Sequence, residues 1–347
     1  MIDFATLQGL TIPEGVVTQI ADASGRVLWA LSSDKVILEV KKITSDTYAA
    51  ETTYTGEQFI LLDIYPKTNG TVKVTYGGLT KTITDTSGAE EPNAQQVYFG
   101  AFNGVSDSVE TPASGELTIG GDCSGFGVGS YAKSSKIQNY CSCITAITDF
   151  GSVGYIPKSA FYSCTGLTSV TIPESVISIG YHAFYNCTGL TSATVSSAII
   201  YDSAFVICTG LTSVTIDRSV TNIEGNPFAY CKALTNFVVD SNNEHYSSSG
   251  AILFNKDITK IIAYPTASGH YTIPASVTSI GDSAFVLGNG NSRTVTMLSS
   301  TPPILGINAF YNLGTQNIIV PVGSGDTYKA AENWSDYADA DLITEAS

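Results

Sequence analysis

Cysteine is the residue type in this chain whose spacing most invites a chemical explanation. Seven cysteines occur among 347 residues, and five of them occupy one position of a repeated pattern: Cys141, Cys164, Cys187, Cys208 and Cys231. When successive repeats stack through paired β-strands, equivalent residues of neighbouring repeats lie about 4.8 Å apart. Side chains stacked in this way point in the same direction, which suits disulfide geometry poorly. The pattern therefore favours buried thiols that act as small hydrophobic side chains over a disulfide, metal or redox function.

The other residue types that could support catalysis form no recognised motif. His182, His245 and His270 lack the spacing of a metal-binding or metalloprotease motif. The run Gly125-x-Gly127-x-Gly129 is not followed by the lysine and hydroxyl residue of a phosphate loop, so loop flexibility is the better account of it. No G-x-S-x-G nucleophile elbow is present.

Acidic residues raise two further possibilities, a cation site and a glycan hydrolase. The run Asp240-Ser-Asn-Asn-Glu244 offers oxygen ligands but lacks the loop glycine of an EF-hand, so a polar turn is favoured. Glycan hydrolysis needs paired carboxylates in a cleft. The acids of the repeats are instead scattered, at Glu174, Asp202, Asp217 and Glu224. We therefore expect no enzyme, no cofactor and no metal.

Tyrosine is the residue type that most suggests recognition. The chain has 19 tyrosines, several of them in the repeats. Aromatic side chains on a polar surface are common in binding faces, including faces for carbohydrate. The candidate partner-binding residues are Tyr181, His182, Tyr185 and Tyr201. Two alternatives stay open: several tyrosines pack against neighbouring repeats, and the Thr/Ser-rich strands form a plain soluble β-surface.

Composition excludes several classes of function. Charged residues make up 14% of the chain and the net charge is −15, so a nucleic-acid partner is not expected. No apolar run approaches the roughly 18 residues that cross a bilayer, so we expect no membrane insertion. The first residues lack the features of a signal peptide. The profile is typical of a β-rich exported or virion-type protein.

Self-similarity determines the expected architecture. The repeats span 156–172, 179–195, 200–216 and 223–239, and their phenylalanines lie 23, 21 and 23 residues apart. A period in the low twenties indicates a solenoid of stacked turns. In one regular turn Leu167, Val170 and Ile172 should point inward, and Thr168, Ser169 and Thr171 should face solvent.

We expect an all-β protein with three parts. Residues 1–31 should form a leader with one hairpin, and residues 32–118 an immunoglobulin-like β-sandwich that serves as a spacer. Its predicted strands are 36–40, 58–64, 71–76, 79–84, 97–102 and 116–119, with Gly77-Gly78 as a hairpin turn.

Residues 119–347 should form the leucine-rich repeat solenoid. It should begin with an irregular capping turn at 120–155 and carry an outward hairpin inserted at 240–279. A C-terminal cap at 321–347 should contain one short helix over 325–334, with Asp326 as its N-cap. Trp334 and Tyr337 should help this cap to close the stack.

The signature I-x-x-x-A-F-x-x-C-x-x-L-T-x-V-x-I resembles the BspA-like leucine-rich repeat family. The runs ILFNKD at 252–257 and IVP at 319–321, with the residues up to Trp334, also resemble that family's variant turn and C-terminal closure. The resemblance covers about residues 135–340. It implies a bacterial surface or secreted binding module that adheres to host or extracellular components without catalysis.

The leader carries a second resemblance, over residues 10–29, to the start of phage and prophage structural proteins of Gram-positive bacteria. Such proteins are often tail or fibre proteins. This resemblance implies a virion-associated protein, made in the host cytoplasm and released by lysis. Residues 1–118 would bind other virion proteins, and the solenoid would bind a protein or glycan on a bacterial cell surface. Self-association into a homo-oligomer is compatible with the sequence. The alternative is a secreted or surface-attached adhesin.

Overall fold

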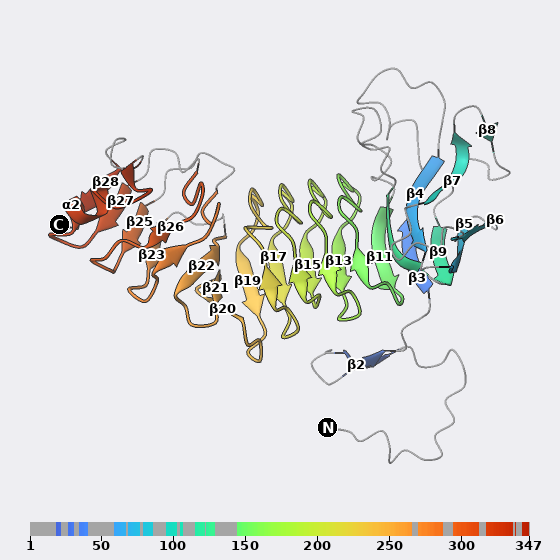
Figure 1. Cartoon of the computed structure of the whole chain (residues 1–347), viewed down its shortest axis with the longest axis horizontal. Helices are drawn as coiled ribbons and strands as arrows, with labels where there is room; N and C mark the ends of the chain where they lie inside the picture. Colours follow the sequence, from blue (N-terminus) through green and yellow to red (C-terminus); the bar gives the residue numbers. More distant parts are fainter. Residues whose placement is uncertain are drawn as a thin grey trace, which may run out of the picture.

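Apart from short helical segments near the C-terminus, the regular elements that the structure, a computed structural model, describes are β-strands, which confirms the predicted all-β class. Figure 1 shows the N-terminal strands gathered at one end and a row of stacked turns running from β11 (Ile144–Phe150) to α2 (Gly325–Lys329). In the part of the chain that is described, no helix is long and apolar enough to cross a membrane. The structure describes residues 19–21, 27–30, 35–40, 59–66, 69–76, 79–85, 95–102, 105–106, 115–121, 123–128, 144–265, 270–286, 294–311, 317–335, 337 and 342–346.

The leader forms the predicted hairpin. Strands β1 (Gln19–Ala21) and β2 (Val27–Ala30) pair antiparallel, with Ile20 opposite Trp29. The turn between them lies outside the described residues.

The next strands form two sheets, in the orders β10-β4-β7-β8 and β11-β3-β9-β5-β6. All six strands predicted between 32 and 118 are present, and Tyr76 lies opposite Leu79, so β5 and β6 pair as the predicted hairpin requires. The turn residues Gly77 and Gly78 lie outside the described residues. The immunoglobulin-like assignment stays a prediction. The strand bounds are β3 (Lys35–Val40), β4 (Phe59–Pro66), β5 (Thr71–Tyr76), β6 (Leu79–Thr84), β7 (Gln95–Phe102), β8 (Val105–Ser106), β9 (Gly115–Gly121) and β10 (Cys123–Val128).

Strands β10 and β11, expected to belong to the first turn of the solenoid, extend these two sheets. β10 pairs with β4, and β11 pairs with β3. β11 is also the strand on which the first regular turn stacks, since the Thr168 N–H donates to the Thr145 carbonyl at 3.3 Å. The domain boundary at 118/119 stays a prediction, with β11 shared by both parts.

Gly125 and Gly127 lie in β10, so loop flexibility was the wrong account of them. A Cβ atom on Gly127 would lie 2.7 Å from the Cα of Ala160 in the first turn. Glycine at this position therefore lets β10 pack directly on the solenoid. Gly129 lies outside the described residues.

Residues 155–239 form the regular part of the predicted solenoid, in which each turn contributes one two-residue and one four-residue strand. The longer strands pair in parallel in the order β13-β15-β17-β19, and the shorter ones in the order β12-β14-β16-β18. The bounds are β12 (Tyr155–Ile156), β13 (Ser169–Ile172), β14 (Ser178–Ile179), β15 (Ser192–Val195), β16 (Ile199–Ile200), β17 (Ser213–Ile216), β18 (Asn222–Ile223) and β19 (Asn236–Val239).

The predicted inward and outward positions of the turn are confirmed. Leu167, Val170 and Ile172 are buried. Thr168, Ser169 and Thr171 are exposed. This alternation follows from the pleat of a strand, which sends successive side chains to opposite faces.

Phenylalanines form a column through the core. The rings of Phe161 and Phe184 stack with centroids 5.1 Å apart, and those of Phe184 and Phe205 with centroids 5.0 Å apart. Phe228 continues the column at 5.5 Å, and Phe126 of β10 contacts Phe161 at 5.5 Å. Aromatic pairs contribute about 0.5–1.5 kcal/mol beyond the burial of their surface. The column joins the N-terminal sheets and the solenoid into one hydrophobic core.

The thiols line the same core. Cys164, Cys187, Cys208 and Cys231 are buried thiols, as the spacing predicted, and so is Cys123. The thiols of the last three turns donate to carbonyl oxygens of Phe161, Phe184 and Phe205 at 3.1, 3.1 and 3.2 Å. Burial raises the pKa of the Cys231 thiol well above its ordinary value. A neutral buried thiol is a poor nucleophile, which fits a packing role. Cys141 and Cys143 lie outside the described residues.

The inserted segment contains the predicted hairpin around 255–257, but the prediction that it projects outward is wrong. It forms three antiparallel strands, β20 (Tyr246–Ser249), β21 (Ile252–Asn255) and β22 (Lys260–Ala263). The side chains of Ile252, Leu253 and Phe254 are all buried. A strand that is apolar on both faces becomes buried on both faces. The insertion therefore lies within the stack, between two cores.

Beyond the insertion the solenoid resumes with the same two kinds of strand. β22 pairs in parallel with β24 (Ser279–Ile280), which pairs with β26 (Ile304–Leu305). The longer strands form the sheet β23-β25-β27-β28. Their bounds are β23 (His270–Ile273), β25 (Thr294–Met297), β27 (Asn317–Val320) and β28 (Ile343–Glu345).

The C-terminal cap closes this second core, as predicted. Trp334 is fully buried, its ring centroid lies 5.9 Å from that of Phe310, and its indole N–H donates to the Pro303 carbonyl at 2.9 Å. Tyr337 contacts Phe310 at 5.5 Å. Burial raises the pKa of Tyr328 to about 12.

The bounds and N-cap of the helix differ from the prediction. The helix α2 ends at Lys329, and the N-cap position is Ser324, so Asp326 belongs to the first turn. Instead of a local side-chain cap, the carboxylate of Glu345 in β28 accepts the N–H groups of Gly323 at 3.0 Å and Gly325 at 2.8 Å. A strand that follows later in the sequence therefore provides the hydrogen-bond acceptors for the backbone N–H groups at the start of the helix.

Candidate functional site

The two-residue strands, with β22 paired alongside them, present the face on which the candidate residues lie. We use the name short-strand face for the outer side of β12, β14, β16, β18, β22, β24 and β26, with one residue before and two after each strand. Parallel pairing places equivalent residues of successive turns side by side on this face, for example Ser178 beside Ile199. Side chains from different turns can therefore form one continuous surface.

Tyr181 and Tyr201 meet on the short-strand face. Their ring centroids lie 4.8 Å apart with a tilt of 34°. The Tyr181 hydroxyl donates to the Glu224 carboxylate at 3.0 Å, two turns away. This hydrogen bond raises the pKa of Tyr181 above its ordinary value. Tyr181 is 42% exposed, so the face presents an aromatic ring that is already held in place.

His182 and Tyr185 form a second pair, on the loop that carries the phenylalanine. Their rings meet edge to face at 5.3 Å, and Tyr185 stacks on Tyr162 at 4.8 Å. His182 has a φ of +57°, a left-handed conformation shared with Ser159 and Ser203 at the same position of their turns. His182 thus occupies the bend before the phenylalanine, where the backbone turns into the core.

The tyrosines of this loop also pack against neighbouring turns, the alternative that the sequence left open. Tyr185 and Tyr230 pack on a small apolar cluster formed by Val206, Ala229 and Val286. Burial raises the pKa of Tyr162 and of Tyr230. The four candidate residues therefore form two pairs: Tyr181 with Tyr201 offers an exposed ring, and His182 with Tyr185 joins a partly buried cluster.

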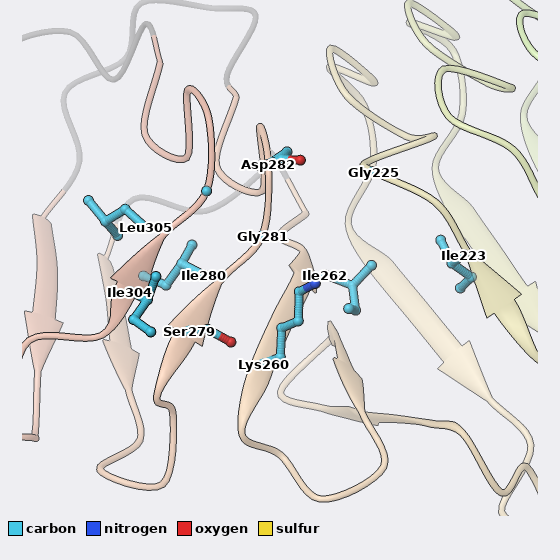
Figure 2. Close-up of a pocket in the computed structure, with 11 residues that line it drawn as sticks. Ile223, Gly225, Lys260, Ile262, Ser279, Ile280, Gly281, Asp282, Ile304 and Leu305 are labelled. Carbon is cyan, nitrogen blue, oxygen red and sulfur yellow. The ribbon is translucent and has the colours of Figure 1, made fainter. Parts of the chain in front are cut away.

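Sequence reasoning missed a groove on the short-strand face at the junction between the two parts of the solenoid. We name it the junction groove; it has a volume of about 220 Å³ and spans β18, β22, β24 and β26. Figure 2 shows Lys260, Ser279 and Ile304 side by side along it, with Asp282 nearby. The break in the phenylalanine period marked this region, but no sequence pattern showed that its side chains would converge.

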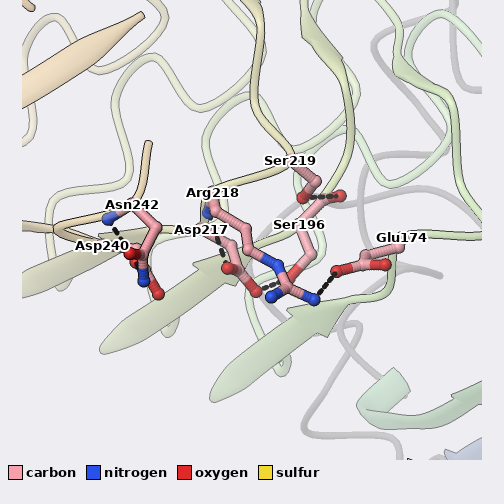
Figure 3. Close-up of polar contacts among 7 residues, drawn as sticks. All are labelled: Glu174, Ser196, Asp217, Arg218, Ser219, Asp240 and Asn242. Carbon is pink, nitrogen blue, oxygen red and sulfur yellow. Dashed lines mark hydrogen bonds and ion pairs between the residues drawn. The ribbon is translucent and has the colours of Figure 1, made fainter. Parts of the chain in front are cut away.

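The scattered acids of the repeats each contact a neighbouring protein group. Asp217 accepts the Ser196 hydroxyl at 2.8 Å, and Glu174 lies 3.7 Å from Arg218 across two turns (Figure 3). The side chains of the ion pair are 57% and 58% exposed, so it is worth only about 0–1 kcal/mol. Asp202 accepts the Ser203 hydroxyl at 2.8 Å. With Glu224 bound to Tyr181, these acids serve contacts between and within turns.

The run from Asp240 to Glu244 is the predicted polar turn. Asp240 accepts the backbone N–H of Asn242 at 2.8 Å (Figure 3). Asn243 is fully buried, and its amide donates to the carbonyls of Asp217 at 2.7 Å and Val220 at 3.0 Å. These bonds tie the start of the insertion to the preceding turn. Among the described residues no group of three or more His, Cys, Asp or Glu is placed to hold a metal ion.

The chain is similar to three solved structures over about half of its length. The structure of the pneumococcal vaccine antigen PcpA is 23% identical, with a TM-score of 0.42, over 49% of this chain and 45% of that one. A leucine-rich cell surface protein from Faecalibacterium prausnitzii A2-165 is 29% identical, with a TM-score of 0.41, over 51% and 48%. A leucine-rich repeat protein from Eubacterium ventriosum ATCC 27560 is 22% identical, with a TM-score of 0.41, over 59% and 61%. The chain thus spans less than two thirds of each of these structures.

Curated protein sequences contain no match to the chain. The family model of the BspA type leucine rich repeat region matches it in six copies, over residues 134–251 and 263–331. These residues make up more than half of the chain and include the turns whose geometry is described above. The chain therefore belongs to the BspA-type leucine-rich repeat family.

Proposed function

We propose that this protein is a non-catalytic binding module that acts at a bacterial surface or outside the cell and holds a protein partner on its short-strand face. Membership of the BspA-type leucine-rich repeat family supports a role in binding. Stacked repeats bury one side of each turn and leave long exposed faces, which repeat proteins use for recognition.

The observation that carries the proposal is the distribution of exposed hydrophobic side chains. Eight large hydrophobic side chains are exposed among the described residues. Four of them lie on the short-strand face: Ile177, Tyr181, Ile304 and Ile307, exposed by 61%, 42%, 74% and 74%. Three of the other four, Val238, Leu298 and Val322, lie on or just after longer strands, one to a strand. The four on the short-strand face instead form two pairs, one beside β14 and one beside β26. Aromatic and aliphatic side chains on an otherwise polar surface supply the binding energy of protein interfaces.

Among the exposed side chains of the short-strand face, Tyr181 is the one best placed to contribute binding energy. Its ring is held by Tyr201 and its hydroxyl by Glu224, so little side-chain freedom remains to be lost on binding. Tyrosine is one of the residue types enriched among interface hot spots.

Binding of the full-length protein to a panel of purified extracellular-matrix and cell-surface proteins, and separately to a glycan array, tests the proposal. We expect at least one protein ligand, and Tyr181→Ala should weaken its binding by roughly 30-fold, or about 2 kcal/mol. The control Thr194→Ala, in the longer strand β15, should leave the affinity unchanged. Binding to glycans alone would replace the protein partner with a carbohydrate, and binding to neither would refute the function.

A role on a phage particle rests on the resemblance of residues 10–29 and stays a prediction. The family model matches no residue before 134, so it does not bear on the leader. Mass spectrometry of purified particles tests this role, and the absence of the chain from them would end it.

A further inference from the structure

The junction groove is too small for a whole drug-sized ligand. Its volume of about 220 Å³ lies below the roughly 300–1,000 Å³ of typical small-molecule pockets. A groove of this size on an open face is suited to one or two side chains of a larger partner. Its chemistry should then match the side chains that enter it.

Glycines form part of the lining of the groove. At the position directly after the short strand, the two turns before the insertion carry Tyr201 and Glu224, whereas the turns after it carry Gly281 and Gly306, as β14 carries Gly180. A Cβ atom on Gly306 would lie 2.4 Å from Oδ1 of Asp282, so this turn has no room for a side chain. The surface that Tyr201 and Glu224 cover in the two turns before the insertion is open here.

Lys260 provides the positive charge of the groove. The end of its side chain lies over Gly281, with Cε 3.6 Å from the position of a Cβ atom there. In the part of the chain that the structure describes, no carboxylate forms an ion pair with Lys260. Asp282, the acidic residue of the groove, accepts the N–H of Ile307 at 2.7 Å and so shapes the next turn. The Lys260 ammonium group is therefore available to a carboxylate from outside.

Apolar side chains flank this charge. Ile304 and Ile307 are each 74% exposed, and the register Lys260–Ser279–Ile304 places Ile304 two strands from the ammonium group. Ser279, between them, adds a hydroxyl group (Figure 2). The groove thus combines a cation, a hydroxyl and an exposed aliphatic surface.

We propose that the junction groove takes an aspartate or glutamate side chain from an extended segment of the protein partner, with apolar residues flanking that acid. The carboxylate pairs with the Lys260 ammonium and the Ser279 hydroxyl, and the apolar neighbours cover Ile304 and Ile307. The inference rests on the proposed function, because it assigns the chemistry of the partner at one end of the short-strand face.

Selection of random peptides displayed on phage against the full-length protein tests the proposal. The parent protein should enrich peptides with an acid between apolar residues, and Lys260→Glu should enrich peptides with a base at the same place. The most enriched acidic peptide, made synthetically, should bind Lys260→Gln roughly tenfold more weakly than the parent, and more weakly at high salt. Lys232→Gln, which removes the same charge from an exposed loop, is the control and should bind like the parent.

Two outcomes would overturn the proposal: no enrichment, or the same charge signature from the parent and from Lys260→Glu. Its failure is distinguishable from failure of the proposed function. If a protein ligand binds the full-length chain with the expected dependence on Tyr181 but without dependence on Lys260, the function stands and the role of the groove is refuted. If no protein binds, both are refuted.

Discussion

Tyr181 illustrates how a solenoid fixes an exposed side chain. Its ring lies beside Tyr201 in the next turn, and its hydroxyl reaches Glu224 in the turn after that. Neither contact is local in sequence, since Glu224 lies 43 residues further along the chain. The repeat period converts this separation into a distance of two turns.

The hydrogen bond to Glu224 makes a prediction about the ionisation of Tyr181. A carboxylate acceptor stabilises the protonated phenol, so the pKa of Tyr181 lies above its ordinary value of about 10. Glu224→Gln should lower the pKa back toward that value. The ¹³C NMR titration of the tyrosine Cζ atoms measures it, and Tyr181→Phe identifies the signal. An unchanged titration midpoint in Glu224→Gln would contradict the contact.

A column of threonines joins the longer strands where they enter the sheet. The hydroxyl of Thr191 donates to the Thr168 carbonyl at 2.9 Å, that of Thr212 to Thr191 at 2.9 Å, and that of Thr235 to Thr212 at 3.0 Å. The backbone N–H groups of the same threonines donate to the same carbonyls. Each carbonyl therefore uses both of its lone pairs between turns.

Thr191→Val should test the contribution of one hydroxyl in this column. The substitution keeps the branched shape but removes the bond to Thr168, so it should lower the free energy of unfolding by about 0.5–1.5 kcal/mol. Thr194→Val is the matched control, because the structure describes no hydrogen bond of the Thr194 hydroxyl, and it should change stability less. Urea denaturation measures both, and equal effects would contradict a structural role for the column.

The C-terminal cap depends on a contact between strand and helix. Hydrogen bonds from the N–H groups of Gly323 and Gly325 lower the pKa of Glu345 below its ordinary value. A carboxyl group whose pKa is lowered by folding contributes stability above its unfolded pKa of about 4.3. That contribution is lost as the pH falls through the lowered pKa of the folded state.

Glu345→Gln should therefore destabilise the cap at neutral pH, and the difference from the parent should shrink as the pH falls below about 4. Thermal unfolding followed by tryptophan fluorescence measures the difference, since Trp334 is buried in this cap. Glu332→Gln, on the exposed surface, is the control and should give no such difference. A difference that does not vary with pH would contradict the role of the carboxylate.

At the scale of the whole molecule, the inserted strands separate two hydrophobic cores. Leu253 belongs to the core that extends from the N-terminal sheets, whereas its neighbours Ile252 and Phe254 belong to the core closed by Trp334. Tyr264 takes a place in the aromatic column of the second core, 4.8 Å from Phe285. The insertion thus provides a packed wall for both halves of the solenoid.

Substitutions on the two sides of this wall should loosen different halves of the molecule. Leu253→Ala should cost about 2–5 kcal/mol and Phe254→Ala about 3–5 kcal/mol. Hydrogen-exchange mass spectrometry should show reduced protection mainly at 160–240 in the first variant and mainly at 270–320 in the second. The same pattern of lost protection in both variants would contradict two separate cores.

The sequence by itself determined the parts of the fold that repeat. A period of 21–23 residues requires stacking, and the alternation in each turn places Leu167, Val170 and Ile172 inside without further information. The phenylalanine and cysteine columns follow from that stacking. The sequence also named Tyr181 and Tyr201 as candidate binding residues, but their contact was seen only in the structure, and their role in binding stays a proposal.

Only the tertiary structure decided the contacts that do not repeat. Four features join segments that share no sequence pattern. They are the pairing of β10 and β11 with the N-terminal sheets, the burial of the insertion, the capping of α2 by Glu345 and the convergence of Lys260 with Ile304. In a repeat, the sequence itself shows which residues of neighbouring turns lie side by side, because every turn packs against a near copy of itself. A single long-range contact has no such pattern in the sequence, because the residues that meet depend on how the other elements have folded and packed.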